Sequence, residues 1–219
     1  MAEREAVLRA TAADPKDLPK PQTFVEGWSL PRSPDLVLDV QDEPYDVPAD
    51  GVINYQTFIV DPGFTEDKWI TASQILPGCA PVVHHVLCFV MSPNQGSRGF
   101  LENNGLGFLS AYVPGYQPTP LPKGMAKYVP AGSKLRFQMH YTANGKPQKD
   151  LSKIGFVFAD PAELTDMVQT VSAVNPGLNI PPYAADYSRT AQTTGYKNPV
   201  RLLALSPHMH VRGKAFSYE

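Results

Sequence analysis

The chain has 219 residues, and its 19 lysines and arginines nearly balance 21 aspartates and glutamates, so there is no electrostatic reason to expect nucleic acid or an anionic membrane as a partner. The 23 prolines are about twice the usual share and lie between short apolar runs, which favours a loop-rich β protein over a helical one. No window reaches the roughly 18 consecutive apolar residues of a membrane helix, so no membrane span is predicted.

Residues 1–45 are predicted to be a lead-in segment. The stretch 2–12 is compatible with a short helix that Pro15 would end, and proline then recurs every few residues up to Asp50. Residues 1–14 are charged and rich in alanine, and they lack the apolar segment of a secretory signal. Either the protein is intracellular, or the numbering begins inside a longer chain.

The chain after the lead-in has the periodicity of β-strands. Polar and apolar residues alternate at 52–60, 135–140 and 153–158, as in strands with one buried face. The runs 82–91 and 202–205 are apolar on both faces, as expected of central strands. The pattern predicts an all-β fold, an antiparallel β-sandwich of jelly-roll-like type.

The predicted first sandwich covers 46–166, and 167–219 is predicted to begin a second, similar domain. Within the first, 61–70 is compatible with one helical turn, and 105–130 is predicted to be a long loop rich in glycine and proline. The second domain is too short to close a sandwich, since such domains usually need about 100 residues. The chain is therefore expected to be a fragment, truncated at Glu219.

All five histidines fall in three strand-like places. His208 and His210 are separated by one residue, so on a strand both rings project from the same face and can share one metal ion. Pro207 suggests a strand edge, where an open coordination position is easy to provide. His84 and His85 are adjacent, and because neighbours on a regular strand point to opposite faces, they reach one ion only at a bulge or a strand end.

His140 is predicted to lie on the polar face of its strand, together with Arg136 and Gln138. It could complete a three-imidazole site with the pair His84 and His85. Gln138 and Tyr141, which flank it, are candidate hydrogen-bond partners. For any single histidine the alternatives are a buried ring bonded to a backbone carbonyl and a surface ring without a role.

Other candidate ligands are sparse. Cys79 and Cys88 are predicted to be buried side chains, with a disulfide or a thiolate ligand as alternatives, and the carboxylates show no pairing pattern. Imidazoles without thiolates or carboxylates suit copper, zinc, iron or nickel and argue against calcium and magnesium. Zinc and copper are the leading candidates, and spacing does not choose between them. The sequence also lacks the GxSxG, HExxH and phosphate-loop motifs.

Three segments carry a resemblance to a known family. The segments PVVHHVLCFV, LRFQMHYTANG and LSPHMHVRGK follow one another at spacings similar to those of the copper type II ascorbate-dependent monooxygenases. This is the group of peptidylglycine α-hydroxylating monooxygenase and dopamine β-monooxygenase, and the chain looks most like its bacterial relatives. The resemblance spans roughly residues 45–219 and implies two β-sandwich domains with one copper ion each.

The resemblance also implies a role for each histidine. His84, His85 and His140 would hold the electron-transferring copper. His208 and His210 would begin the site of the copper that binds dioxygen and hydroxylates the substrate.

A methionine completes that second site in the family, and it is expected beyond Glu219. Met139 and Met209 are predicted to point away from the histidine faces and to pack in the core. The family disulfides are not reproduced, so the resemblance does not extend to the substrates of the animal enzymes.

The resemblance implies an enzyme that hydroxylates a small organic substrate with dioxygen and a one-electron reductant such as ascorbate. Because the family generally works outside the cytoplasm, a periplasmic or extracellular location is expected, with a signal upstream of Met1. The chain as given is expected to load its first site without turning over substrate. The alternatives are a non-catalytic β-sandwich used for metal binding or electron transfer, and a zinc hydrolase.

Overall fold

The structure, a computed structural model, describes residues 26–93, 107–175, 177–193, 196, 198–208 and 213–219. It divides into two compact units, 1–170 and 171–219, which are described separately. All strands that the described residues form belong to the first unit. Among the described residues, no helix is long and apolar enough to cross a membrane.

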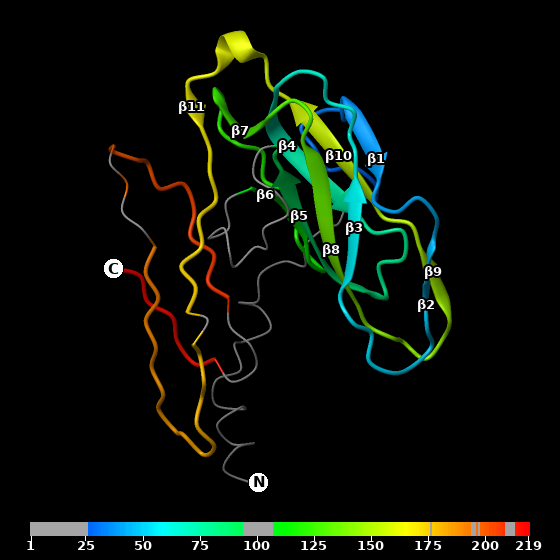
Figure 1. The fold of residues 1–219 in the computed structure, drawn as a ribbon, viewed down its shortest axis with the longest axis vertical. Helices are drawn as coiled ribbons and strands as arrows, with labels where there is room; N and C mark the ends of the chain where they lie inside the picture. The colour runs from blue at the N-terminus through cyan, green and yellow to red at the C-terminus, as the bar shows by residue number, and fades with distance from the viewer. Residues whose placement is uncertain (1–25, 94–106, 176, 194–195, 197, 209–212) are drawn as a thin grey trace, which may run out of the picture. The chain divides into compact units, whose positions relative to one another are not determined.

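The first unit consists of β-strands and one short 3-10 helix, η1 (Figure 1). In chain order the elements are β1 (Leu36–Asp39), β2 (Tyr45–Val47), β3 (Gln56–Val60), β4 (Lys68–Leu76), β5 (Val83–Met91), β6 (Phe108–Tyr112), β7 (Met125–Val129), β8 (Lys134–Tyr141), β9 (Gln148–Asp150), β10 (Lys153–Phe158), η1 (Pro161–Glu163) and β11 (Asp166–Met167).

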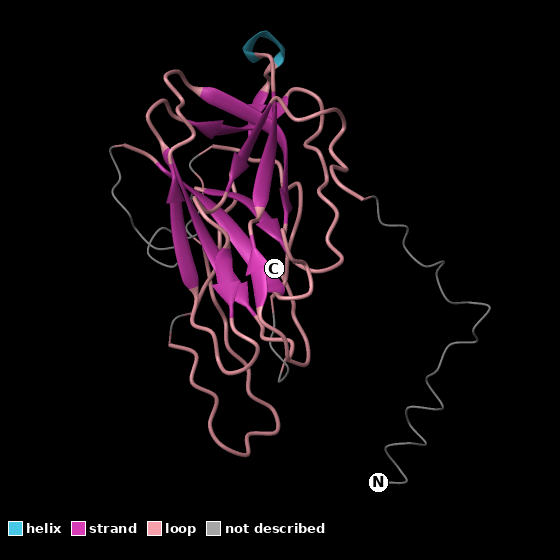
Figure 2. Ribbon diagram, turned by 90° about the vertical axis from the view of Figure 1, so that its right-hand side faces the viewer, coloured by secondary structure: helices cyan, strands magenta, loops and turns pink. Residues whose placement is uncertain are grey.

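These strands form three sheets, with orders β1-β10-β4-β7-β11, β3-β8-β5-β6 and β2-β9. Every pairing is antiparallel except that of β11 with β7. The predicted all-β sandwich is therefore confirmed for the first unit, and Figure 2 shows its strands stacked as layers.

The core lies between the two larger sheets and takes buried side chains from both. Strand β8 shows how the sequence builds it, because Leu135, Phe137, Met139 and Tyr141 alternate inward and are at most 1% exposed. They join Ile154 and other side chains of the five-stranded sheet in one hydrophobic cluster. The alternation that predicted this strand is the alternation that fills the core.

A buried polar network sits at the end of β8 beside the core. The carboxyl group of Asp150, which is fully buried, accepts hydrogen bonds from Gln41 Nε2 (3.1 Å), Tyr141 Oη (2.9 Å) and Ser152 Oγ (2.9 Å), and from the backbone N–H of Cys79 (2.8 Å). Burial, followed by the proximity of Asp150, raises the pKa of Tyr141, so its hydroxyl remains a donor. The network ties β8, β9 and the segment after β1 together.

A lysine joins the two larger sheets. Lys127 on β7 donates hydrogen bonds to the carbonyl oxygens of Phe108 (3.1 Å) and Leu109 (3.0 Å) on β6, and its ammonium group lies over the Phe108 ring. Burial lowers the pKa of Lys127 to about 8. Because β6 is an edge strand of its sheet, this contact joins the two sheets at an edge.

The structure corrects several expected boundaries. The segment 1–45 is not only a lead-in, since β1 lies within it and pairs with β10. The stretch 61–70 contains no helical turn and ends in the start of β4. The segment 105–130 contains β6 and β7 as well as loops. In each case strand pairing from distant segments, which local composition does not encode, decided the outcome.

The second unit, 171–219, has no helix or strand among its described residues. The predicted central strand at 202–205 is wrong for this structure, because Leu202, Leu203 and Leu205 are 70%, 43% and 50% exposed and belong to no sheet. An apolar run becomes a strand only where a partner strand satisfies its backbone groups. The first unit also extends past the expected boundary at residue 167, since β11 pairs with β7.

Candidate metal centre

The adjacent histidines of β5 lie at a β-bulge. In the pairing of β5 with β8, Val83 is opposite Tyr141 and His85 is opposite His140, with the register shifted between Val83 and His85. His84 is therefore an extra residue without its own partner on β8, and the bulge changes the direction of its side chain. The sequence predicted that His84 and His85 can face one ion only at a bulge or a strand end, and the structure has a bulge there.

The bulge brings three imidazole rings together. His84, His85 and His140 each offer a ring nitrogen, and these nitrogens lie within 4.8 Å of one another. The ring centroids are 4.8 to 5.3 Å apart, and the two Nδ1 atoms of His84 and His85 are 3.1 Å apart. Nitrogens bound at about 2.1 Å to one ion are up to about 4 Å apart, so small side-chain movements suffice for shared coordination.

His140 is a partly enclosed ligand candidate. Its Nδ1 atom is buried and has no hydrogen-bond partner among the described residues. Burial, followed by the proximity of His84, lowers the pKa of His140 and favours the neutral ring. Neutral imidazole is the form that binds metals, and a buried nitrogen without a partner needs an explanation that a bound ion would provide.

Tyr55 borders the three histidines, and the sequence patterns did not single it out. Its ring centroid lies 4.8 Å from that of His140 and 5.7 Å from that of His85. The residue immediately precedes β3, whose first residue, Gln56, pairs with Met139, and this register places Tyr55 beside His140. Only the pairing of β3 with β8 reveals this neighbour, because the two residues are far apart in the chain.

The neighbours of His140 in the sequence belong to the opposite side of the sheet. Met139 is fully buried, and its sulfur lies 3.3 Å from Gln41 Nε2, so it packs in the core as predicted. Tyr141 also points inward, to Asp150, and is not the hydrogen-bond partner of His140 that the sequence suggested. Gln138 is half-buried on the same face as His140.

Neither cysteine belongs to the histidine group. Cys79 and Cys88 are free thiols in this structure, which makes the disulfide alternative wrong here. Cys88 is fully buried, and burial raises the pKa of its thiol. In the part of the chain that the structure describes, His84, His85 and His140 form the group of three or more histidine, cysteine or carboxylate side chains within ligand distance.

The predicted pair His208 and His210 belongs to the second unit. His208 is exposed and lies outside any strand, and His210 and Met209 lie outside the described residues. The assignment of this pair to a second metal site therefore stays a prediction.

Comparisons with known proteins were made at three levels. No protein-family model, no curated protein and no solved structure matches this chain. The histidine site and the sequence motifs are therefore the features that bear on the metal and the activity.

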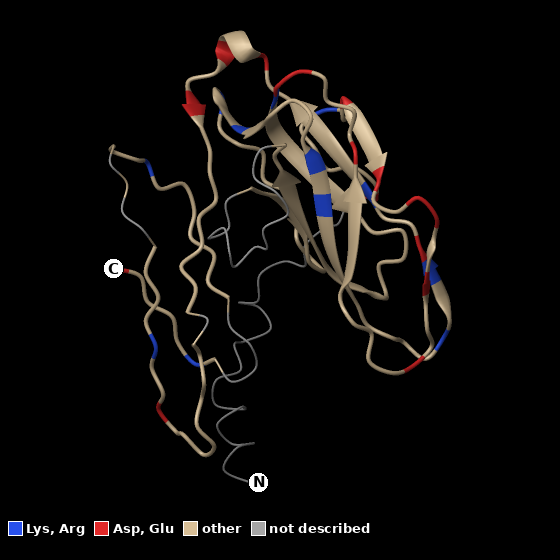
Figure 3. Ribbon diagram, in the orientation of Figure 1, with Lys and Arg blue, Asp and Glu red and all other residues tan. Residues whose placement is uncertain are grey.

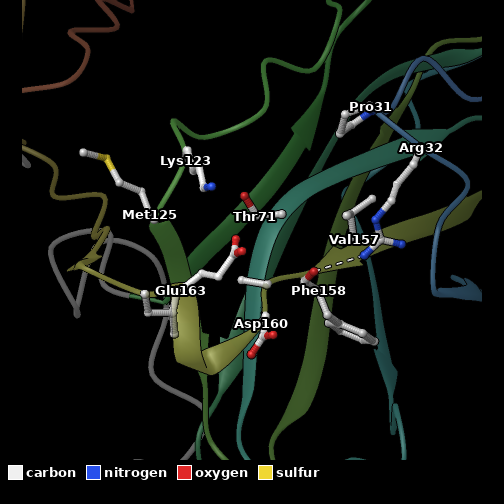
Figure 4. A pocket seen from close by; sticks show the side chains of 12 residues that line it. Pro31, Arg32, Thr71, Lys123, Met125, Val157, Phe158, Asp160 and Glu163 are labelled. Carbon is white, nitrogen blue, oxygen red and sulfur yellow. Dashed lines mark hydrogen bonds between the residues drawn. The ribbon is translucent and has the colours of Figure 1, made fainter.

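A shallow pocket of the first unit is separate from the histidines. It has a volume of about 260 Å³ and is lined by side chains of both charges, among them Arg32, Lys123, Asp160 and Glu163 (Figure 4). Arg32 donates a hydrogen bond to the carbonyl oxygen of Phe158 (3.1 Å), and Asp160 Oδ1 accepts one from the backbone N–H of Ala162 (2.9 Å). These two side chains are engaged in holding the local backbone, and the pocket offers no comparable metal-ligand set.

Proposed function

We propose that this chain carries the electron-transferring copper site of a copper-dependent monooxygenase that hydroxylates an organic substrate with dioxygen and a reductant such as ascorbate. The observation that carries the proposal is the bulge in β5, which lets the adjacent His84 and His85 meet His140 across the sheet. A bulge at this position has an evident use when both rings must face one ion. The order and spacing of the histidine motifs, which resemble the copper type II monooxygenases, favour this activity.

The residues of the site fit a late first-row transition metal. The group contains three imidazoles and no thiolate or carboxylate, and His140 keeps a buried nitrogen without a partner. Copper bound there would supply a one-electron store. The protein holds all three ligands on the paired strands β5 and β8, so the rings keep their places whether the site is reduced or oxidised, and Tyr55 keeps water from one side.

The second half of the activity is assigned to the second unit. His208 and His210 would begin the site that binds dioxygen and performs the hydroxylation. A labile copper pair is poorly compatible with a thiol-rich cytosol that scavenges copper, so we also propose a periplasmic or extracellular location. Fractionation that finds the native full-length protein in the cytosol would contradict this location.

The test is a copper titration of the purified 219-residue chain, followed by electron paramagnetic resonance. We expect one tight equivalent with a cupric signal from nitrogen ligands, a weaker second equivalent, and no coupled hydroxylation. His84→Ala and His140→Ala should each lower the affinity for the tightly bound copper ion by about 100-fold or more. Loss of a residue that only hydrogen-bonds to a metal ligand already lowers metal affinity 10- to 100-fold. His208→Ala is the matched control and should leave the tight equivalent unchanged.

Zinc is the second candidate, because three histidines are also a common catalytic zinc set. A chain that retains zinc tightly against copper and hydrolyses activated esters would favour the zinc hydrolase. Tight copper binding with one-electron reduction but no hydroxylation by the full-length protein would favour a pure electron-transfer module.

A further inference from the structure

The four-stranded sheet that carries the histidines has an unusual charge distribution. Its strands β3, β8, β5 and β6 contain no aspartate or glutamate, although the whole chain has a net charge of −2. The lysine and arginine within these strands, Lys134 and Arg136, both lie on β8, where Figure 3 shows them as two blue bands. This sheet therefore presents positive charge from its own strands without a compensating carboxylate.

Arg136 lies on the same face as the histidines. It is four residues from His140 on a strand whose side chains alternate, so both point away from the core, with Gln138 between them. About 13 Å of strand separates the two positions. Arg136 pairs with Ile59 of β3 and with Phe89 of β5, and Gln138 pairs with Thr57 and Leu87. The path from the guanidinium to the imidazoles is thus lined by neutral side chains.

The guanidinium of Arg136 is held in place by an aromatic ring. Its central carbon lies 5.1 Å from the centroid of the Phe89 ring. Among the described residues Arg136 forms no salt bridge, and Asp61, which follows β3, instead accepts a hydrogen bond from the backbone N–H of Gly63 (2.9 Å). An arginine fixed by stacking keeps its planar row of donors for an oxyanion.

We propose that the outer-face side chains Arg136 and Gln138, with the nearly buried Phe89 ring behind the guanidinium, bind the small organic anion that reduces the histidine site, an enediolate of the ascorbate type. This inference rests on the proposed function for the identity of the electron acceptor. With copper bound at the histidines, the ascorbate monoanion would give one electron to the cupric ion and one proton to water, and it would leave as the ascorbyl radical anion. Charge complementarity selects this occupant over a neutral or cationic donor.

The first test measures anion binding without metal. Nuclear magnetic resonance of the metal-free 219-residue protein, titrated with ascorbate under anaerobic conditions, should show saturable shifts at Arg136, Gln138 and their strand neighbours. Arg136→Gln should weaken this binding by about 5- to 10-fold, and Arg136→Lys should weaken it less, because a lysine keeps the charge but loses the paired donors. Lys153→Gln is the control, since Lys153 is on β10 of the other sheet and faces Asp39.

The second test measures reduction of the copper-loaded protein by stopped-flow absorption. With ascorbate at concentrations below saturation, Arg136→Gln should lower the reduction rate by about 5- to 10-fold, and added salt should lower the wild-type rate in the same direction. With neutral hydroquinone, wild type and variant should be reduced at the same rate.

The outcomes separate this inference from the proposed function. Unchanged ascorbate binding in Arg136→Gln, or an equal change of rate with ascorbate and hydroquinone, would overturn the anion site. If copper does not bind at the histidines, the proposed function fails, but the metal-free titration still decides whether the anion binds at Arg136.

Discussion

The two faces of strand β8 differ in whether their buried polar groups have hydrogen-bond partners. On the inner face, Met139 and Tyr141 lie in a core where the polar groups around Asp150 are satisfied by four hydrogen bonds. On the outer face, His140 keeps a buried nitrogen without a hydrogen-bond partner among the described residues. Satisfied buried groups stabilise the fold, whereas an unsatisfied buried group costs stability that a bound ligand could restore. Mutations on the inner face should therefore change stability, and mutations on the outer face should change ligand binding.

The largest expected effect on stability comes from Asp150 on β9, whose polar network adjoins the inner face of β8. Asp150→Ala removes the acceptor of four donors, three of them on buried side chains, and we expect the free energy of unfolding to fall by about 3–5 kcal/mol. Urea denaturation followed by tryptophan fluorescence measures this. The control is Asp46→Ala, which breaks an exposed ion pair with Lys149 and should cost at most about 1 kcal/mol. Similar losses for the two variants would show that the network does not anchor the fold.

The buried Lys127 gives a pH-dependent effect of intermediate size. Its pKa is about 8 in the folded protein, below the ordinary value of 10.5, so burial of the charged form costs stability below pH 8. Stability should rise between pH 8 and 10.5, where the unfolded chain binds more protons than the folded one. The free energy of unfolding of Lys127→Met minus that of wild type should be larger at pH 7 than at pH 10.5, by roughly 1–3 kcal/mol.

The measurement is urea denaturation of wild type and Lys127→Met at both pH values. Other groups titrate in this range, but they are common to both proteins and cancel in the difference. If the difference in the free energy of unfolding between Lys127→Met and wild type does not depend on pH, Lys127 remains charged in the folded state throughout this pH range. The loss of two hydrogen bonds to β6 should add a constant cost of about 1 kcal/mol at either pH.

Met139 tests whether the two faces are separate. Met139→Leu nearly conserves volume, so we expect a loss of less than about 1.5 kcal/mol and no change in copper affinity or in the cupric spectrum. The same two measurements on His140→Ala should give the reverse result, with copper binding lost and stability little changed. A changed spectrum in Met139→Leu would indicate that the sulfur reaches the metal.

Tyr55 should give the smallest change in stability, because it is 56% exposed. Tyr55→Ala uncovers one side of His140, and we expect less than about 1 kcal/mol of lost stability, a decrease of a few-fold in copper affinity and easier access of azide to the cupric site. Tyr55→Phe retains the ring and should behave as wild type. If Phe fails to restore the wild-type behaviour, the hydroxyl rather than the ring has the role.

Much of the first unit was predictable because its signals are local. The alternation in β8 and β10 follows from a period of two residues with one buried face, and the polar position of His140 follows from the same period. The need for a bulge at His84 and His85 followed from strand geometry alone. The apolar run 202–205 misled the prediction, because high local hydrophobicity does not show whether a partner strand exists.

By itself the sequence determined the all-β class, the inward side chains of β8 and the three histidines that could share an ion, because each of these depends on residue type and on spacing within one strand. Only the tertiary structure decided that β8 lies between β3 and β5, and therefore that Tyr55 borders His140 and that Arg136 stacks on Phe89. Those contacts join residues 85 and 47 positions apart in the chain. They exist only because interstrand hydrogen bonds fix a register that no single segment encodes.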